Sequence, residues 1–349
     1  MTAPVARFDE IDAAWLGSAL GRPVDRLVRT PLGDGVGFLG DLARLEVEFA
    51  DGGSGRMIAK IPTTDAGGRA VGRLLDVWRR EHRFYVDLAP DLGDIVPRCR
   101  LALGDEEQDR WLLVLDEIHP ARPLDQLAGA PRPDVEEVVD ALADLHGRFD
   151  DRTGGSPSWM PGIGSGTAHL LRDAVVGSLP AWEDRFGSVL PTGFDAVLHD
   201  FAPRLDRWLA SQAERPLTLA HADVRIDNLV FPERGHVRLV DWQTAMRTNG
   251  VTDVAILLAT STTVDDRRAW EDDLLLRYRD GVARHGVDLE PDRLRRDYAE
   301  SFLWWSSMFA NNLSTIDPPP GRGPELFDSM ISRTAQAATD HEAGRSSSN

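Results

Sequence analysis

Residues Leu219–Asp241 read LAHADVRIDNLVFPERGHVRLVD, and this stretch decides how the rest of the chain is interpreted. Two apolar runs, 229–231 and 237–240, flank the turn-forming residues 232–235, which predicts two short strands joined as a hairpin. The loops at the ends of such a hairpin are held by a rigid base. They carry four polar residues, namely His221, Asp223, Asn228 and Asp241.

These side chains suit phosphoryl transfer. A carboxylate can orient and deprotonate an attacking hydroxyl, and further oxygen ligands can hold the magnesium ions that neutralise the transferring phosphate. The competing interpretation is that an Asp-rich hairpin in an acidic protein is only a solvated turn. The upstream sequence discriminates between the two, because a phosphotransferase also needs groups that bind a nucleotide.

A glycine-rich segment lies near the start of the chain, where Gly35, Gly37 and Gly40 match Gly-x-Gly-x-x-Gly. Asp41 stands where a Walker A loop needs Lys followed by Ser or Thr. A Rossmann fingerprint requires a helix next, but residues 44–49 alternate polar and apolar, which predicts a strand. Two interpretations remain, a glycine-rich hairpin over nucleotide phosphates and an ordinary flexible turn.

Lys60 is the only Lys among 39 basic residues, and all the others are Arg. It lies in residues 57–61, an apolar run that predicts a strand. Glu81 falls among the apolar positions of a helix predicted from Val71 to about Leu88, so it points inward. An inward carboxylate needs a cationic partner, and Lys60 is the candidate. The alternatives are a chance surface Lys and a solvated Glu within a charged run.

Three further features extend the pattern. Residues 111–115 predict a buried strand that leads into a connecting segment beginning at Asp116. Asp253 opens an apolar helix, which it can cap. An aromatic stripe that includes Trp304 and Trp305 lies on a helix predicted over 293–313, and such a stripe either packs in the core or lines a site for a ring-shaped molecule.

The order of these motifs resembles that of kinase-fold enzymes. His221-Ala-Asp223 and Asp241-Trp-Gln depart from the His-Arg-Asp and Asp-Phe-Gly of protein kinases, and no Ala-Pro-Glu follows. The chain is similar instead to the aminoglycoside phosphotransferase and ecdysteroid-kinase-like families of small-molecule phosphotransferases, over almost its whole length after residue 30. The resemblance implies an α+β, protein-kinase-like fold with a strand-rich N-lobe (residues 1–115) and a mainly helical C-lobe (residues 116–349).

The resemblance also implies roles for individual residues. Asp223 would be the catalytic base, with His221 supporting its loop through hydrogen bonds, and Asn228 and Asp241 would hold Mg²⁺. An Asp at position 253 would brace the catalytic loop, an alternative to capping its helix. Residues that would bind ATP are Gly35, Gly37, Gly40, Lys60, Glu81, Asp116 and Ile118.

Composition and charge limit the classes of partner that this chain can be expected to bind. A formal charge of −18 disfavours nucleic acid and is compatible with a cationic small molecule. The single Cys99 excludes an intrachain disulfide and a cysteine-based zinc cluster. No signal segment opens the sequence and no apolar run is long enough to span a bilayer, so a cytoplasmic protein without a membrane partner is expected.

The sequence therefore predicts an ATP-dependent kinase that phosphorylates a hydroxyl of a small molecule. Aminoglycoside-like antibiotics, amino alcohols and steroid-type alcohols are the acceptor classes that the resemblance suggests. The alternative is a nucleotide-binding pseudokinase that acts as an interaction module, which usually lacks the base, the Asn or the Lys. All three residues are present here, as Asp223, Asn228 and Lys60.

Overall fold

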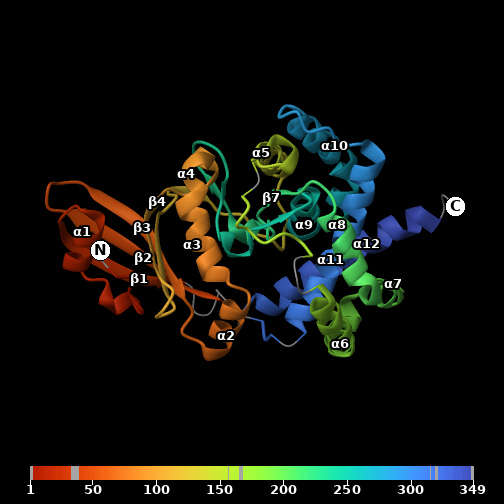
Figure 1. The fold of residues 1–349 in the computed structure, drawn as a ribbon, viewed down its shortest axis with the longest axis horizontal. Helices are drawn as coiled ribbons and strands as arrows, with labels where there is room; N and C mark the ends of the chain where they lie inside the picture. The colour runs from red at the N-terminus through yellow and green to blue at the C-terminus, as the bar shows by residue number, and fades with distance from the viewer. Residues whose placement is uncertain are drawn as a thin grey trace. The chain divides into compact units, whose positions relative to one another are not determined.

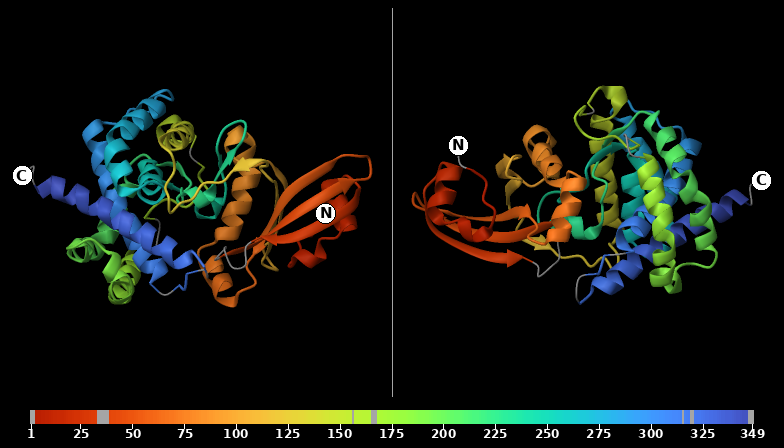
Figure 2. Two further views of the ribbon diagram at one scale, coloured as in Figure 1. Left: turned by 180° about the vertical axis from the view of Figure 1, so that it is seen from behind. Right: turned by 60° about the horizontal axis from the view of Figure 1, so that its bottom comes forward.

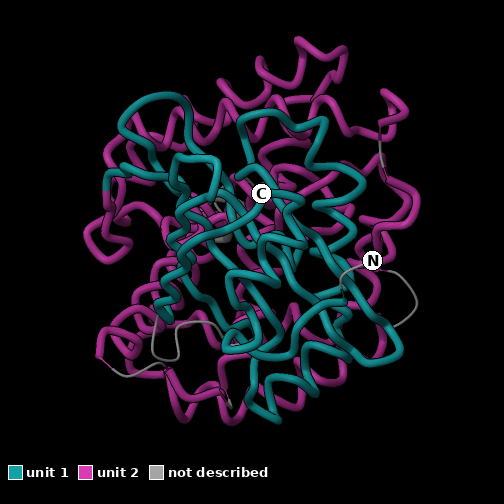
Figure 3. The backbone as a smooth tube through the Cα atoms, turned by 90° about the vertical axis from the view of Figure 1, so that its left-hand side faces the viewer, with its two compact units in different colours: residues 1–122, 230–244 teal, residues 123–229, 245–349 magenta. Residues whose placement is uncertain are grey.

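The computed structural model describes residues 3–32, 39–155, 157–164, 168–314, 316–318 and 321–346. The chain divides into two compact units (Figure 3). Unit 1 comprises residues 1–122 and 230–244, and unit 2 comprises residues 123–229 and 245–349. This division reflects compactness and does not define functional lobes. The lobe boundary after Leu115 therefore stays a prediction.

The main element of unit 1 is a five-stranded antiparallel sheet in the order β1-β2-β3-β5-β4. The predicted strand after the glycine-rich segment is confirmed as β2, the strand with Lys60 as β3, and the buried strand before the connecting segment as β5. The strands are β1 (Val24–Leu32), β2 (Gly40–Phe49), β3 (Ser54–Pro62), β4 (Cys99–Asp105) and β5 (Arg110–Asp116).

The two faces of this sheet are covered by different helices (Figures 1 and 2). Helix α1 (Ala13–Leu20) packs on the face that carries Ala59 and Ile61 of β3. Helix α3 (Val77–Asp87) packs through Trp78 against Trp111 on the other face. Because side chains alternate along a strand, Lys60 points to the α3 face, where Glu81 lies.

The helix predicted continuously from Val71 to Leu88 is interrupted, which corrects the sequence interpretation. Helix α2 (Ala66–Leu74) ends before Asp76, whose backbone adopts a left-handed φ of 55°. Leu74 is 84% exposed, so the apolar positions of α2 do not share the buried face of α3. Gly72 of α2 leaves room for the Trp78 side chain of α3, because a Cβ at Gly72 would lie 2.4 Å from the Trp78 ring.

The predicted hairpin is confirmed. Strands β8 (Leu229–Pro232) and β9 (Arg238–Leu239) form a three-stranded sheet with β6 (Ala121–Arg122). A short 3₁₀-helix, η7 (Trp242–Thr244), follows β9.

Unit 2 is mostly helical, and all residues of its helix α9 are buried. Helices α5, α10 and α11 pack against α9 (Figure 1). Strands β7 (Thr218–Ala220) and β10 (Met246–Thr248) pair antiparallel beside them. The helices are α5 (Arg132–Arg148), α6 (Ala168–Phe186), α7 (Phe194–Phe201), α8 (Leu205–Ala213), α9 (Val251–Ser261), α10 (Val264–Ala283), α11 (Pro291–Leu313) and α12 (Gly323–Ser346).

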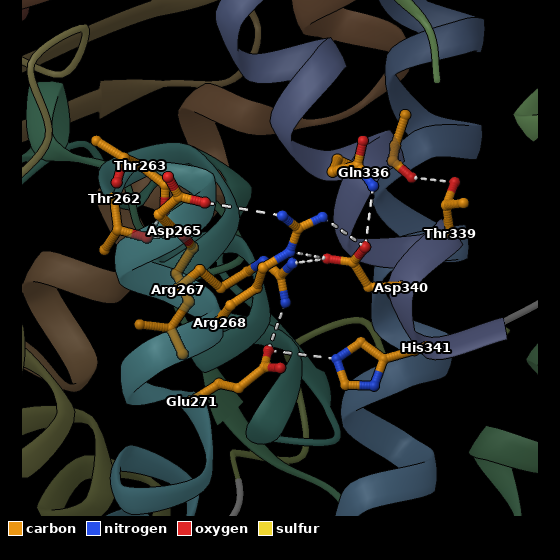
Figure 4. Close-up of polar contacts among 12 residues, drawn as sticks. Thr262, Thr263, Asp265, Arg267, Arg268, Glu271, Gln336, Thr339, Asp340 and His341 are labelled. Carbon is orange, nitrogen blue, oxygen red and sulfur yellow. Dashed lines mark hydrogen bonds and ion pairs between the residues drawn. The ribbon is translucent and has the colours of Figure 1, made fainter. Parts of the chain in front are cut away.

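An ionic cluster around the buried Arg267 ties α10 to α12 (Figure 4). Arg267 is 1% exposed and donates to Glu271 at 2.6 Å and also to Asp340. Arg268 donates to the same Asp340 carboxylate through two nitrogens at 2.8 Å. Burial alone would raise the pKa of Asp340, but its hydrogen bonds to Arg268 and Gln336 and the charges of both arginines outweigh this and lower the pKa to about 2.

The aromatic stripe of α11 belongs to the core. Trp304 is 6% exposed and stacks on Trp208 of α8 at 5.6 Å between ring centroids. Trp305 is 8% exposed and donates its indole N–H to the carbonyl of Thr252. None of the helices in the described ranges has the length and apolar character needed to cross a bilayer.

Candidate active site

The segment with the proposed base begins where β7 ends. His221 is fully buried, and Ala222 turns the chain with a left-handed φ of 60°. Asp223 then accepts from the Asn228 amide at 2.7 Å, while the same amide nitrogen donates to the Asp223 carbonyl at 2.9 Å. Since Asn228 uses its NH₂ group in these bonds, its side-chain oxygen points away from Asp223.

Arg225 is a further charged neighbour of this carboxylate. Its Nε lies 3.1 and 3.3 Å from the two carboxylate oxygens of Asp223, and its NH1 lies 3.2 Å from Asp227. No sequence pattern singles out Arg225. Its position two residues after Asp223 was the available signal, but a loop has no periodicity from which a side-chain direction can be predicted.

Asp253 braces the loop that leads to Asp223, which decides between the two roles left open for it. One carboxylate oxygen accepts the backbone N–H of His221 at 2.7 Å and the other accepts that of Ala222 at 2.9 Å. The N-cap of α9 is Gly250, so Asp253 lies in the first turn and does not cap the helix. Both loop amides are buried, so each N–H needs a hydrogen-bond acceptor, and Asp253 supplies one to each.

A buried chain of hydrogen bonds runs from Asp253 through His146 to Tyr278. His146 of α5 lies 3.3 Å from its carboxylate through Nε2 and 3.0 Å from the Tyr278 hydroxyl through Nδ1. Since a carboxylate only accepts, Nε2 carries the proton and Nδ1 accepts from the hydroxyl. His146 is therefore a buried residue with a defined hydrogen-bonding role.

In unit 1, Lys60 contacts two carboxylates from distant parts of the sequence. Its Nζ lies 2.7 Å from Glu81 and 2.7 Å from Asp241, and the Glu81 side chain is only 3% exposed. Burial alone would lower the pKa of Lys60, but the charges of Asp241 and Glu81 outweigh it and raise the pKa. Burial raises the pKa of Glu81, and Lys60 opposes that shift.

The Asp241 loop is anchored by an aromatic contact. Asp241 has a left-handed φ of 66°, and the next residue, Trp242, stacks on Phe84 of α3 at 4.0 Å and donates to the Leu239 carbonyl at 3.0 Å. Trp242 therefore couples the position of Asp241 to the helix that carries Glu81.

Two other segments are predicted to bind the nucleotide. The structure describes only part of the glycine-rich segment, and it describes all of the segment from Asp116 to Ile118. Gly35 and Gly37 lie outside the described residues. Gly40 begins β2, and a Cβ there would lie 3.1 Å from Cε of Lys60, so the small residue lets the Lys side chain pass. Asp116 ends β5, and Arg100 holds its carboxylate at 2.6 and 2.8 Å. Ile118 lies two residues after β5 and is partly buried.

Comparison with known proteins identifies the family. A model described as the phosphotransferase enzyme family matches residues 34–294. The chain belongs to this family. The family resemblance inferred from the sequence is confirmed, and the protein is a phosphotransferase. A comparison with curated proteins found no match.

Solved structures show that this phosphotransferase has a kinase-like fold, as the sequence predicted. Choline kinase LicA from Streptococcus pneumoniae has a TM-score of 0.57 and 14% identity, over 95% of this chain and 99% of that chain. LicA in complex with AMP has a TM-score of 0.52 and 14% identity, over 92% and 93%. Plasmodium vivax ethanolamine kinase has a TM-score of 0.51 and 12% identity, over 96% and 86%.

The oxygen donors of the phosphotransferase fit magnesium. Mg²⁺ is usually bound by one or two carboxylates and substrate phosphates, with several waters retained. Asp241 offers a carboxylate 30% exposed, and Asn228 offers the amide oxygen directed away from Asp223. Within the described ranges no group of three or more His, Cys, Asp and Glu side chains could hold a metal ion by itself.

Proposed function

We propose that this phosphotransferase uses ATP and Mg²⁺ to phosphorylate a hydroxyl group of a small molecule. The observation that carries the proposal is the contact of Lys60 with both Glu81 and Asp241 at 2.7 Å. A largely buried ammonium is retained in a chain that otherwise uses Arg, and a compact point charge suits phosphate oxygens. The AMP complex of LicA supports a nucleotide as donor.

The residues of unit 1 bind the donor in this proposal. Lys60 contacts the nucleotide phosphates and Glu81 keeps the ammonium oriented, while the segment with Gly35, Gly37 and Gly40 covers the phosphates. The backbone of the segment from Asp116 to Ile118 receives the nucleotide base.

Asp223 acts on the acceptor in this proposal. Asp223 orients the hydroxyl and takes its proton as the oxygen bonds to the γ-phosphorus and ADP leaves. His221 holds the loop through its backbone bond to Asp253. Asn228 and Asp241 would hold the magnesium ion, which supplies charge neutralisation at the phosphates when bound.

Amine-bearing alcohols are the first acceptors to test. A formal charge of −18 attracts cations, and the folds of a choline kinase and an ethanolamine kinase are similar to this one. Aminoglycosides and steroid alcohols complete the panel. Release of ADP, measured with each compound and with water alone, identifies the acceptor class.

Two substitutions test the mechanism. Asp223→Asn should retain nucleotide binding and lower turnover by about 10² to 10⁴-fold, because only the base is lost. Asp241→Asn should weaken both nucleotide binding and turnover, because a magnesium ligand is lost. Glu233→Gln, in the exposed hairpin turn, is the matched control. Calorimetry with MgATP measures binding.

The outcomes separate an enzyme from a pseudokinase. A wild-type protein that binds MgATP but does not release ADP with any compound of the panel or with water would favour the interaction module. Unchanged turnover in Asp223→Asn, or nucleotide binding that depends on neither magnesium nor Asp241, would refute the assigned roles.

A further inference from the structure

Trp78 joins helix α3 to the start of strand β2. It is the second residue of α3 and is 5% exposed, and its indole N–H donates to the backbone carbonyl of Leu39 at 2.7 Å. Leu39 lies directly before Gly40, where the glycine-rich segment ends and β2 begins. The proposed function leaves Trp78 without a role.

The Leu39 carbonyl is held from two sides. It accepts the Thr63 N–H at 3.1 Å as well as the Trp78 N–H. The Leu39 side chain also packs against the cluster of Val77, Trp78 and Trp111. The start of β2, the segment after β3 and the first turn of α3 therefore meet at one residue.

This junction lies beside the contact between Lys60 and Glu81. Gly40 follows Leu39 in the chain, and a Cβ at Gly40 would lie 3.1 Å from Cε of Lys60. Glu81 is three residues after Trp78, about one turn along α3, and its carboxylate contacts the Lys60 ammonium at 2.7 Å. The bond from Trp78 thus ties the helix that carries Glu81 to backbone next to Lys60.

The start of α3 is weakly capped. Asp76, the residue before the helix, has left-handed backbone and, within the described part of the chain, makes no side-chain capping bond. Its carboxylate pairs with the exposed Arg79, and such exposed pairs contribute little to stability. Breaking the bond from the buried Trp78 indole would leave a buried donor unsatisfied, so this bond is the stronger of the two restraints.

We propose that Trp78 is a positioning residue of this phosphotransferase, which holds α3 against the start of β2 so that Glu81 reaches Lys60. The inference rests on the proposed function, in which Lys60 contacts the nucleotide phosphates. In this role Trp78 contacts neither the nucleotide nor the metal. It keeps the ammonium oriented, so its loss should weaken binding of the phosphates and spare binding of the nucleoside.

The test separates phosphate binding from nucleoside binding. Calorimetry measures the affinities for MgADP and for adenosine in wild type and in Trp78→Phe, which keeps a buried ring but removes the N–H. The MgADP affinity should fall by about fivefold, the usual share of one hydrogen bond, while the adenosine affinity stays close to that of wild type. Trp111→Phe is the matched control, because the Trp111 N–H donates to Asp109 and not to Leu39. It should leave both affinities as in wild type.

A second pair of variants displaces the two indoles without replacing them. A Cβ at Gly72 would lie 2.4 Å from the Trp78 ring, so Gly72→Ala should displace that indole and reproduce the loss of MgADP affinity. A Cβ at Gly104 would lie 2.6 Å from the Trp111 ring, which makes Gly104→Ala its control. If Trp78→Phe does not fold, Gly72→Ala decides. A selective loss for MgADP supports the proposal, and wild-type affinity for both ligands overturns it.

A double variant shows whether Trp78 acts through Glu81. Glu81→Gln removes a charged partner of the Lys60 ammonium and should itself weaken MgADP binding. In that background Trp78→Phe should change the MgADP affinity by less than about twofold, because the contact that Trp78 positions is already lost. Fully additive losses would overturn the proposal. Equal losses for MgADP and adenosine, or an equal loss in Trp111→Phe, would also overturn it.

Failure of this proposal differs from failure of the proposed function. A wild-type protein that does not bind MgADP would refute the proposed function and the role of Trp78 with it. A wild-type protein that binds both ligands, beside a Trp78→Phe variant with unchanged MgADP affinity, would overturn only the role of Trp78.

Discussion

Replacing Lys60 with Met tests the charge balance of the Lys60, Glu81 and Asp241 cluster. The substitution keeps an unbranched side chain that is shorter by about one atom, but it leaves two carboxylates without the cation between them. At 2.7 Å each contact is worth roughly 6 kcal/mol of attraction at an effective dielectric constant of about 20, before desolvation is subtracted. Breaking a buried pair costs about 3 to 5 kcal/mol.

We expect about 3 kcal/mol of destabilisation at pH 8, the lower end of this range. The Asp241 side chain is 30% exposed and can be hydrated, whereas Glu81 at 3% exposure cannot. Adding Glu81→Gln to Lys60→Met removes the isolated buried charge and should restore stability to within about 1 kcal/mol of wild type. The second substitution should therefore recover about 2 kcal/mol of the stability that the first removes.

The effect of pH has a definite sign. Burial already raises the pKa of Glu81, and loss of Lys60 removes the charge that opposes the shift. A carboxyl whose pKa is raised in the folded state favours folding below its unfolded pKa and loses that contribution as pH rises through the folded pKa. The destabilisation of Lys60→Met should therefore be larger at pH 8 than at pH 5.

Urea unfolding followed by tryptophan fluorescence at both pH values measures these effects. Equal midpoints for wild type and Lys60→Met at pH 8 would refute the reasoning. So would a double variant no more stable than Lys60→Met, because the cost would then come from lost packing and not from unpaired charge.

Lys60→Arg should weaken MgADP binding in calorimetry despite the retained charge, because a planar guanidinium does not replace a compact ammonium held by Glu81 and Asp241; wild-type affinity would contradict this. Asp253→Asn should lower ATP turnover by about 10²-fold while MgADP still binds, because an amide oxygen accepts only one of the two loop N–H bonds; equal turnover would exclude a bracing role. Asp340→Asn should lower the thermal unfolding temperature at pH 7, because Arg267 loses a partner inside the protein. The pKa of Asp340 is lowered to about 2, so its contribution is present above about pH 4 and the gap between wild type and variant should narrow as pH falls toward 2.

Local patterns in the sequence determined the class of fold and the main chemical groups. Alternation along β3 directs Lys60 away from the apolar face, and the helical position of Glu81 beside Trp78 and Tyr85 directs it inward, so their meeting could be predicted. The order of motifs was sufficient to infer a kinase-like phosphotransferase. These inferences succeed because strand and helix periodicities depend on neighbouring residues.

Only the tertiary structure decided contacts between residues far apart in the sequence. Asp241 reaches Lys60 across 181 residues, and Asp253 reaches the His221 and Ala222 amides across more than 30 residues. The break at Asp76 likewise follows from packing, because Trp78 takes the space that Gly72 leaves open. Left-handed backbone at Asp76, Ala222 and Asp241 costs free energy locally and is stabilised by the packing and hydrogen bonds around it. For this reason no local sequence pattern predicts it.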